Sequence, residues 1–201
     1  MSWEIVPLRP EHAEAVAAIH AEGQPGTFLT SLGMPFLRAL YTAMASSPSC
    51  LGFVAVEKGE VIGIVVGTLT PGSVFKELLL GEGPGLILST LGALFRHPRL
   101  IPRVLQTALY PGQAHAGPGE AEVLYFGVRA DRRGEGIGRA LFGRMIEVLR
   151  ERGARAVGLT VDESNQVAKR FYRRWGMTPV HTFTLYGRAM TWYTLPLGDE
   201  R

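Results

Sequence analysis

The chain of 201 residues has one cysteine, Cys50, and 3 lysines against 18 arginines. A lone cysteine cannot form an internal disulfide, and with five scattered histidines it makes no credible zinc ligand set. The 46% apolar and 19% charged residues are ordinary for a globular domain and unlike a disordered chain. We therefore expect a folded domain that needs neither disulfides nor a metal ion.

The sequence also lacks long runs of like charge and long apolar stretches. No run of five like charges and no basic stripe with interleaved aromatics occurs, which argues against a nucleic-acid-binding protein. The most apolar stretch, residues 85–95, is shorter than the ~20 residues that cross a bilayer. The start, MSWEIVPLRPEH, lacks a basic region followed by an apolar one, so we expect a cytoplasmic protein without signal peptide or membrane span. The net charge of +3 favours an anionic partner such as a phosphorylated cofactor.

Hydrophobic periodicity predicts one mixed α/β domain over residues 1–201. The expected strands are residues 3–8, 51–57, 61–69, 122–128, 156–161, 180–185 and 189–195, and the expected helices are 10–20, 36–44, 137–149 and 167–175. The strand–helix–strand unit predicts a parallel pair with a right-handed crossover, and the hairpins predict antiparallel neighbours. We expect a mixed, partly antiparallel sheet with helices on both faces.

Residues 70–120 depart from this regular order. Glycine and proline separate short apolar pieces, and the segment is too long for a plain loop in a compact domain. We interpret it as an inserted helical segment of two or three short helices with a mobile loop near residues 113–122. Its basic residues (Arg96, His97, Arg99 and Arg103) leave two alternatives open. One is a lid that binds an anionic acceptor; the other, which we favour, is a helical pair that buries its apolar face or forms a homodimer contact.

The glycine-rich stretch DRRGEGIGRAL, residues 131–141, follows a predicted strand and opens a predicted helix. A helix amino terminus presents unpaired N–H groups and partial positive charge, so it binds phosphate readily. The stretch is not a P-loop, because Arg139 and Ala140 stand where that loop has lysine and serine or threonine. It is not the dinucleotide fingerprint, because only one residue separates Gly136 from Gly138.

Two motifs in order resemble the GNAT family of N-acetyltransferases. RGEGIG, residues 133–138, is similar to the family's Arg/Gln-x-x-Gly-x-Gly/Ala, and NQVAKRFYRRWGM, residues 165–177, is similar to N-x-x-A-x-x-L-Y-x-x-x-G-F. The second motif departs by Phe171 for leucine and Met177 for phenylalanine. The resemblance implies the acyl-CoA N-acyltransferase fold, acetyl-CoA as cosubstrate without a metal, and direct acetyl transfer to an amine.

The resemblance also implies roles for individual residues. It places coenzyme binding at Phe126, Gly127, Val128, Arg133, Gly134, Glu135, Gly136, Ile137, Gly138, Arg139, Asn165 and Tyr172. The glycine turn would hold the pyrophosphate, and backbone N–H groups of residues 126–128 would bind the reaction's oxyanion. Asn165 would bond the pantetheine arm and can also cap its helix. Tyr172 would be the general acid at the coenzyme sulfur, the alternative being an aromatic of the helix core face.

A general base is needed because an amine with a pKa near ~10 is only about one part in a thousand neutral at pH 7. Glu122 is the candidate, since several GNAT relatives carry a glutamate on this strand; the alternative is a solvated strand end. With strict alternation Glu122, Leu124 and Phe126 share one face, and Tyr125 faces the other way unless the strand bulges.

The sequence does not identify the amine that accepts the acetyl group. The loop at residues 23–31 and the insertion are the expected walls of its site, with Glu22, Gln24, Thr27 and Thr30 as hydrogen-bonding groups. We expect a primary amine on a small molecule, such as an amino sugar. A protein amino terminus or lysine is one alternative, although relatives that modify amino termini carry a glutamate where this chain has Thr160. A non-catalytic acyl-CoA sensor is another.

Overall fold

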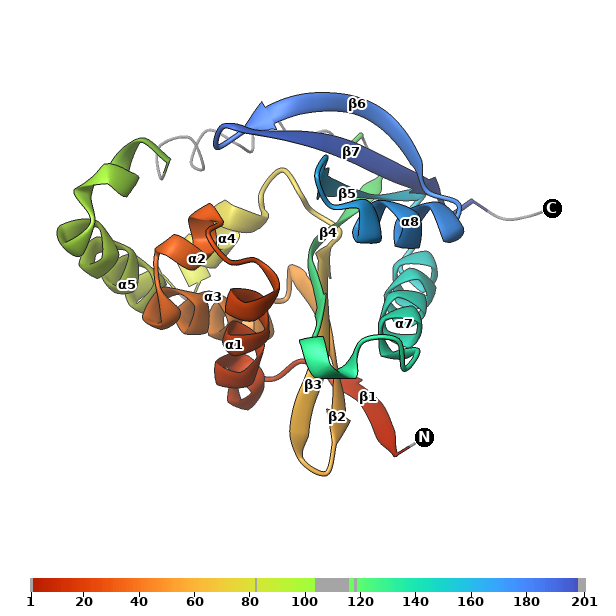
Figure 1. The fold of residues 1–201 in the computed structure, drawn as a ribbon, viewed down its shortest axis with the longest axis horizontal. Coiled ribbons are helices and arrows are strands. Elements are labelled where there is room, and N and C mark those ends of the chain that lie inside the picture. The colour runs from red at the N-terminus through yellow and green to blue at the C-terminus, as the bar shows by residue number, and fades with distance from the viewer. Residues whose placement is uncertain (1, 82, 104–115, 118, 199–201) are drawn as a thin grey trace.

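The computed structural model describes residues 2–81, 83–103, 116–117 and 119–198 (Figure 1). The strands are β1 (Trp3–Pro7), β2 (Cys50–Glu57), β3 (Glu60–Thr68), β4 (Glu120–Val128), β5 (Ala156–Asp162), β6 (Thr178–Leu185) and β7 (Arg188–Pro196). The α-helices are α1 (Ala13–Gly23), α2 (Phe28–Ser31), α3 (Met34–Ser46), α4 (Val74–Gly81), α5 (Gly83–Arg96), α7 (Ile137–Glu151) and α8 (Gln166–Arg174). Short 3-10 turns are η1 (Pro10–His12), η2 (Pro98–Leu100) and η4 (Ala130–Arg132).

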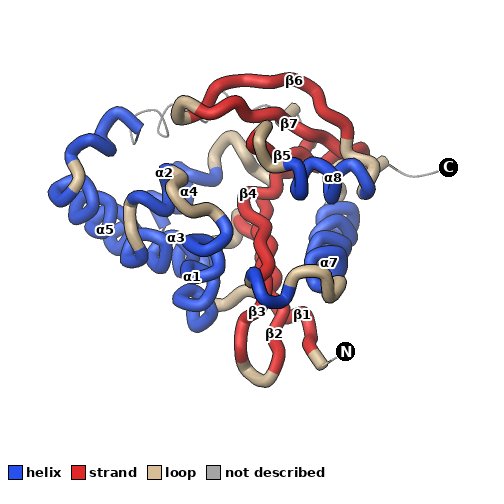
Figure 2. The backbone as a smooth tube through the Cα atoms, in the orientation of Figure 1, coloured by secondary structure: helices blue, strands red, loops and turns tan. Residues whose placement is uncertain are grey.

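The seven strands form one sheet in the order β1-β2-β3-β4-β5-β7-β6 (Figure 2). Every neighbouring pair is antiparallel except β4 and β5, which are parallel and joined through α7. The mixed sheet and its parallel pair confirm the fold class expected from the sequence. The crossover places the amino terminus of α7 beside the carboxyl end of β4.

Helices cover both faces of the sheet and divide the core in two (Figure 1). On one face α1 and α3 bury side chains such as Val16, Leu37 and Tyr41. On the other face α7 buries Leu141 and Phe142, and α8 packs beside it. Each helix places apolar residues three or four positions apart, so one side of it meets the sheet and the other meets water.

The described part of residues 70–120 contains two α-helices, as the sequence predicts, whereas the status of this segment as an insertion stays a prediction. Helices α4 and α5 bury Val74, Leu78, Leu86 and Ala93 in the cluster that α3 also joins. The loop expected near residues 113–122 lies largely outside the described residues. Among the helices that the structure describes, none is both long and apolar enough to cross a membrane.

Gly158 of β5 is required by the packing of Trp192. A Cβ added at Gly158 would lie 1.9 Å from Trp192 Cζ2, and the indole is only 2% exposed. We expect Gly158→Ala to lower the free energy of unfolding by about 1–3 kcal/mol through overpacking, measured by urea denaturation.

Gly92→Ala in α5 is the matched control, because a Cβ there meets nothing within 4 Å. It should be neutral or stabilise by about 1 kcal/mol, since alanine favours helix. Equal effects at the two sites would contradict the packing role of Gly158.

Candidate active site

Strands β4 and β5 diverge after a short parallel contact. They share the register positions Glu120–Ala156, Ala121–Val157 and Glu122–Gly158, and the described residues contain no further pairing between them. Beyond that point β4 stays bonded to β3 and β5 to β7. The edge of β4 that faces β5 therefore offers its backbone N–H and C=O groups over residues 123–128. An extended ligand can pair with such an edge as an added strand.

The glycine turn leads from β4 into α7. Gly134 and Gly136 have φ of +90° and +83°, a backbone conformation that favours glycine, and a Cβ at either would meet nothing within 4 Å. Gly136 is the N-cap of α7, with no side-chain cap and no acidic residue in the first turn. The first N–H groups of α7 are therefore available to an anion. Gly138 serves packing instead, since its Cβ would lie 3.1 Å from Phe126 Cζ.

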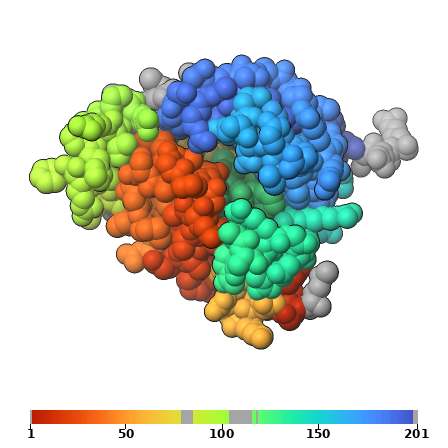
Figure 3. All heavy atoms as spheres, viewed as in Figure 1, coloured from red at the N-terminus to blue at the C-terminus, as the bar shows by residue number. Residues whose placement is uncertain are grey.

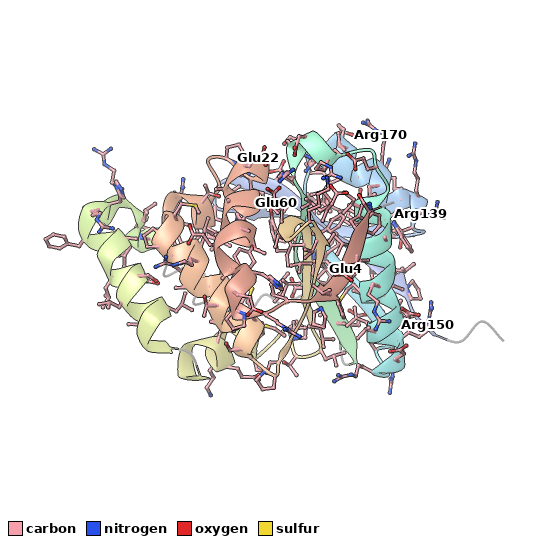
Figure 4. The ribbon with its side chains drawn as sticks, turned by 90° about the horizontal axis from the view of Figure 1, so that it is seen from below. Glu4, Glu22, Glu60, Arg139, Arg150 and Arg170 are labelled. Carbon is pink, nitrogen blue, oxygen red and sulfur yellow. The ribbon has the colours of Figure 1, made fainter. Side chains whose placement is uncertain are left out.

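The charged residues around this turn differ in their partners. Arg132 is held by Glu57 at 2.7 Å and by Glu135 at 2.9 Å, so these groups neutralise one another. Arg133 donates from Nε to the Val128 carbonyl at 3.2 Å and is otherwise exposed. Arg139 has no hydrogen bond or ion pair with any residue that the structure describes; Figure 4 shows it on α7. The cationic contribution predicted for the turn therefore comes from Arg133 and Arg139, whereas the Glu135 side chain is engaged.

Two further predicted coenzyme residues have roles in the fold. The Ile137 side chain is 1% exposed in the core, which leaves only its backbone to a ligand. Asn165 Oδ1 accepts from Ala168 N at 3.0 Å and caps α8, which confirms the capping interpretation. The Asn165 amide nitrogen makes no hydrogen bond to a described residue, so it can still donate to a ligand.

Tyr172 of α8 is 8% exposed and lies among three phenylalanine rings. Its ring centroid is 6.3 Å from that of Phe126, 5.6 Å from Phe142 and 5.4 Å from Phe171. Burial, and then the nearby Tyr125 hydroxyl, hold the pKa of Tyr172 well above its ordinary value. The phenol therefore stays protonated at neutral pH, and within the described residues its hydroxyl has no hydrogen-bond partner. The Tyr172 hydroxyl can therefore donate its proton to a ligand.

Glu122 of β4 is 8% exposed, so the alternative of a solvated strand end is wrong. Burial away from charged partners raises its pKa to about 7. Its carboxyl makes no ion pair or hydrogen bond to a described residue. A carboxyl that titrates near neutral pH can accept a proton from an amine under ordinary conditions.

A β-bulge at Leu124 changes which side chains share a face of β4. Val66 of β3 pairs with Tyr125, and the next residue, Gly67, pairs with Val123. Strict alternation therefore fails: Tyr125 joins Glu122 on the α1–α3 face, and Phe126 packs with the α7–α8 cluster. The expectation that Phe126 shares the face of Glu122 is wrong, because the extra residue reverses the alternation.

The model of the acetyltransferase (GNAT) family matches residues 26–177, more than half of the chain. The chain belongs to the GNAT acetyltransferase family. Enzymes of this family are acyltransferases that use acetyl-CoA.

Relatives and a solved structure agree with this assignment. The chain is 43% identical over 66 residues to the mycothiol acetyltransferase of Beutenbergia cavernae, covering 33% of this chain and 22% of that enzyme. It is 32% identical over 60 residues to a putative [ribosomal protein bS18]-alanine N-acetyltransferase of Bacillus subtilis, covering 30% of this chain and 40% of that protein. The structure of Arabidopsis thaliana NAA60 in complex with acetyl-CoA superposes with a TM-score of 0.61 at 18% identity, covering 96% and 98% of the two chains. The matched segments thus span less than half of either curated relative.

The surface is hollowed above β4 (Figure 3). Figure 3 shows the surface hollowed between the first helices, the β6–β7 hairpin and the glycine turn, with the green part of the chain that contains β4 at its floor. Phe28 of α2 contacts Tyr186 at the hairpin turn, with ring centroids 4.7 Å apart. The loop at residues 23–31 therefore lies beside the β6–β7 hairpin, and its Thr27 and Thr30 hydroxyls are bonded to the Gln24 carbonyl and to each other. Its role as a wall of the acceptor site stays a prediction.

Several residues packed against β4 and β5 were not identified from the sequence. Trp192 covers Gly158, the register partner of Glu122; a glycine inside a strand was the available signal of close approach. His20 is bonded through Nδ1 to the Tyr41 hydroxyl at 2.6 Å and stacks on Tyr125 at 4.4 Å. Burial lowers the pKa of His20 to about 4, so it stays neutral.

The acids nearest the second motif are engaged elsewhere. Asp162 pairs with Arg188 at 2.7 Å, and Glu163 pairs with Lys169 at 2.7 Å. Hydrogen bonds hold the pKa values of both carboxyls below their ordinary range, which makes them poor bases. Their interpretation as acids of the turn rather than bases fits this geometry, and Glu122 remains the better candidate.

Proposed function

We propose that the protein transfers an acetyl group from acetyl-CoA directly to a primary amine of a small molecule. The positions of Glu122 and Tyr172 relative to β4 support this proposal. The buried Glu122 carboxyl, with its pKa near 7, lies at the point where β4 and β5 diverge. The protonated Tyr172 phenol lies on the other face of the same strand. A proton acceptor and a proton donor thus flank the edge of β4 to which an acyl donor can bind.

The sequence motifs and the fold together support one binding path for the coenzyme. The N–H groups at the start of α7 and the charges of Arg133 and Arg139 would hold the pyrophosphate. The pantetheine arm would pair with the free edge of β4 near Val128, and the Asn165 amide would donate to one of its carbonyls. This path brings the thioester to the diverging strands.

The transfer then needs three proton movements. Glu122, directly or through a water molecule, takes a proton from the ammonium group of the acceptor. The neutral amine attacks the thioester carbonyl, and backbone N–H groups of residues 126–128 stabilise the oxyanion. The C–S bond breaks, the departing thiolate takes the Tyr172 proton, and the nitrogen of the new amide releases its second proton to solvent. The products are the N-acetyl amide and free coenzyme A. Glu122 then gives its proton to solvent, and Tyr172 takes one from it.

A small acceptor fits the features around Glu122 better than a protein chain does. The Phe28–Tyr186 contact narrows the approach to this face, and the relative from B. cavernae is named for mycothiol and not for a protein. Thr160 also stands where relatives that modify amino termini have glutamate. The name of the B. subtilis relative favours a protein amino terminus as the second candidate.

Thiol release measured over a panel of amines tests the proposal. The panel should include amino sugars, other small primary amines, and peptides that begin with alanine or contain lysine. We expect at least one small amine to give a kcat/KM ten or more times that of any peptide. Preference for the peptides would support the second candidate. Acetyl-CoA binding without turnover of any amine would support the sensor hypothesis.

Replacing Tyr172 with phenylalanine should lower turnover by about 10–100-fold, because the leaving thiolate loses its proton donor. The affinity for acetyl-CoA should change little, since the ring and its packing remain. Single-turnover kinetics and calorimetry separate the two quantities. Tyr193→Phe is the control, as Tyr193 is a 1% exposed tyrosine of β7. Equal rates for Tyr172→Phe and the wild type would remove the acid role.

A further inference from the structure

Helix α5 carries an exposed apolar face that the acetyl-transfer site does not use. Ile87, Leu88, Leu91 and Phe95 are spaced three or four residues apart or adjacent, and their exposed fractions are 46%, 72%, 57% and 92%. The opposite side of α5, including Leu86, is buried against the domain. Large apolar side chains gathered in this way on a surface are typical of an interaction site.

The charged residues of this segment all have the same sign. Residues 83–103 contain no aspartate or glutamate, and their charged residues are Arg96, Arg99 and Arg103. All three arginines are exposed at the carboxyl end of α5 and just beyond it. Arg96, His97 and Arg99 also line a hollow of about 590 Å³ beside Ser31. The segment thus joins an apolar stripe to a cationic end and contains no acidic residue of its own.

We propose that this face, defined by Ile87, Leu88, Leu91, Phe95, Arg96 and Arg99, binds the surface of an anionic lipid bilayer. A helix of 14 residues is about 21 Å long, too short to cross a bilayer but suited to lying in its interface. The apolar stripe enters the boundary between headgroups and acyl chains. The arginines bond lipid phosphates, to which guanidinium groups bind in a fixed geometry.

Charge argues against a second copy of this chain as the occupant. In an isologous dimer the same patch meets itself, so the arginines of both copies would gather at one interface. No acidic residue in 83–103 could neutralise them. An anionic membrane supplies the negative charge that the arginines lack. Its attraction for the arginines strengthens the binding that burial of the apolar stripe provides.

The position of α5 is compatible with catalysis at a membrane. The helix lies at the outer edge of the molecule beyond α3, whereas α7 and α8 lie at the other end (Figures 1 and 3). Docking through α5 leaves the glycine turn in front of α7 facing water. The coenzyme can therefore enter and leave while the protein is bound.

Sedimentation with vesicles tests the proposal. The full chain should sediment with vesicles that contain phosphatidylglycerol and not with pure phosphatidylcholine, and salt should weaken the binding. Phe95→Ser should lower the partition coefficient roughly tenfold or more, because it removes the most exposed apolar group. The double variant Arg96→Glu, Arg99→Glu should do the same on anionic vesicles.

Val180→Ser is the control, since Val180 is a 58% exposed valine of β6 outside the face. It should bind vesicles as the wild type does, and every variant should keep its affinity for acetyl-CoA if it is folded. Absence of binding to anionic vesicles would overturn the proposal. So would a concentration-dependent dimer that Phe95→Ser dissociates while vesicle binding is unchanged, which would make a second copy the occupant.

Discussion

Replacing Glu122 with glutamine should lower turnover by about 10²-fold or more at pH 7.5, because the amine loses its proton acceptor. The wild-type rate should rise as pH increases through about 7, where the buried carboxyl ionises, and then level off. The variant should lack this rise. Measurement of kcat and kcat/KM from pH 5.5 to 9 at saturating acetyl-CoA gives both results.

The same substitution should change stability in a pH-dependent way. The folded pKa of Glu122 is raised above its unfolded value, so the ionised form opposes folding. Stability from this group is fully present below pH 4.5 and is lost as pH rises through about 7. Glu122→Gln should therefore be more stable than the wild type at pH 8 by about 2–3 kcal/mol relative to any difference at pH 4.

Glu120→Gln is the matched control for Glu122→Gln. Glu120 lies on the same strand, and its carboxylate accepts from the Gly117 N–H at 2.7 Å. Its substitution should leave the pH–rate profile unchanged. An unaltered profile in Glu122→Gln itself would point to another base.

Replacing Gly136 with valine should weaken acetyl-CoA binding by about 10²-fold or more. A β-branched residue is strained at φ of +83°, so the turn must shift and with it the first N–H groups of α7. Those groups are the proposed contacts to the pyrophosphate. Titration calorimetry with coenzyme A measures the effect without requiring the acceptor amine.

Gly153→Val separates coenzyme binding from stability. Gly153 follows the carboxyl end of α7, has φ of +80°, and its Cβ would also meet nothing within 4 Å. Both variants should lose about 1–3 kcal/mol of stability from backbone strain. Only Gly136→Val should lose coenzyme affinity; equal affinities in the two variants would defeat the assignment of the phosphate site to this turn.

Much of the fold was predictable because local patterns agree with the final structure. Hydrophobic periodicity predicted most of the strands and helices. The strand–helix–strand order around α7 predicted the parallel pair β4 and β5. The glycine turn and the Asn165 cap were predictable because each depends on a few neighbouring residues. These features require backbone conformations that the sequence itself makes favourable.

Other features depend on contacts between distant segments. The bulge at Leu124 arises from register with β3, which spacing along one strand does not reveal. The neutralisation of Arg132 requires Glu57, which is 75 residues away. The raised pKa of Glu122 comes from helices packed over the sheet, so a single strand could suggest the glutamate but not its ionisation.

The bulge has a further consequence for the proposed reaction. The bulge turns Tyr125 to the side of Glu122 and leaves Phe126 beside Tyr172. The proton that Glu122 takes from the acceptor would therefore not be the proton that Tyr172 delivers to sulfur. In each turnover Glu122 would gain one proton and Tyr172 would lose one, and both must exchange protons with solvent before the next cycle.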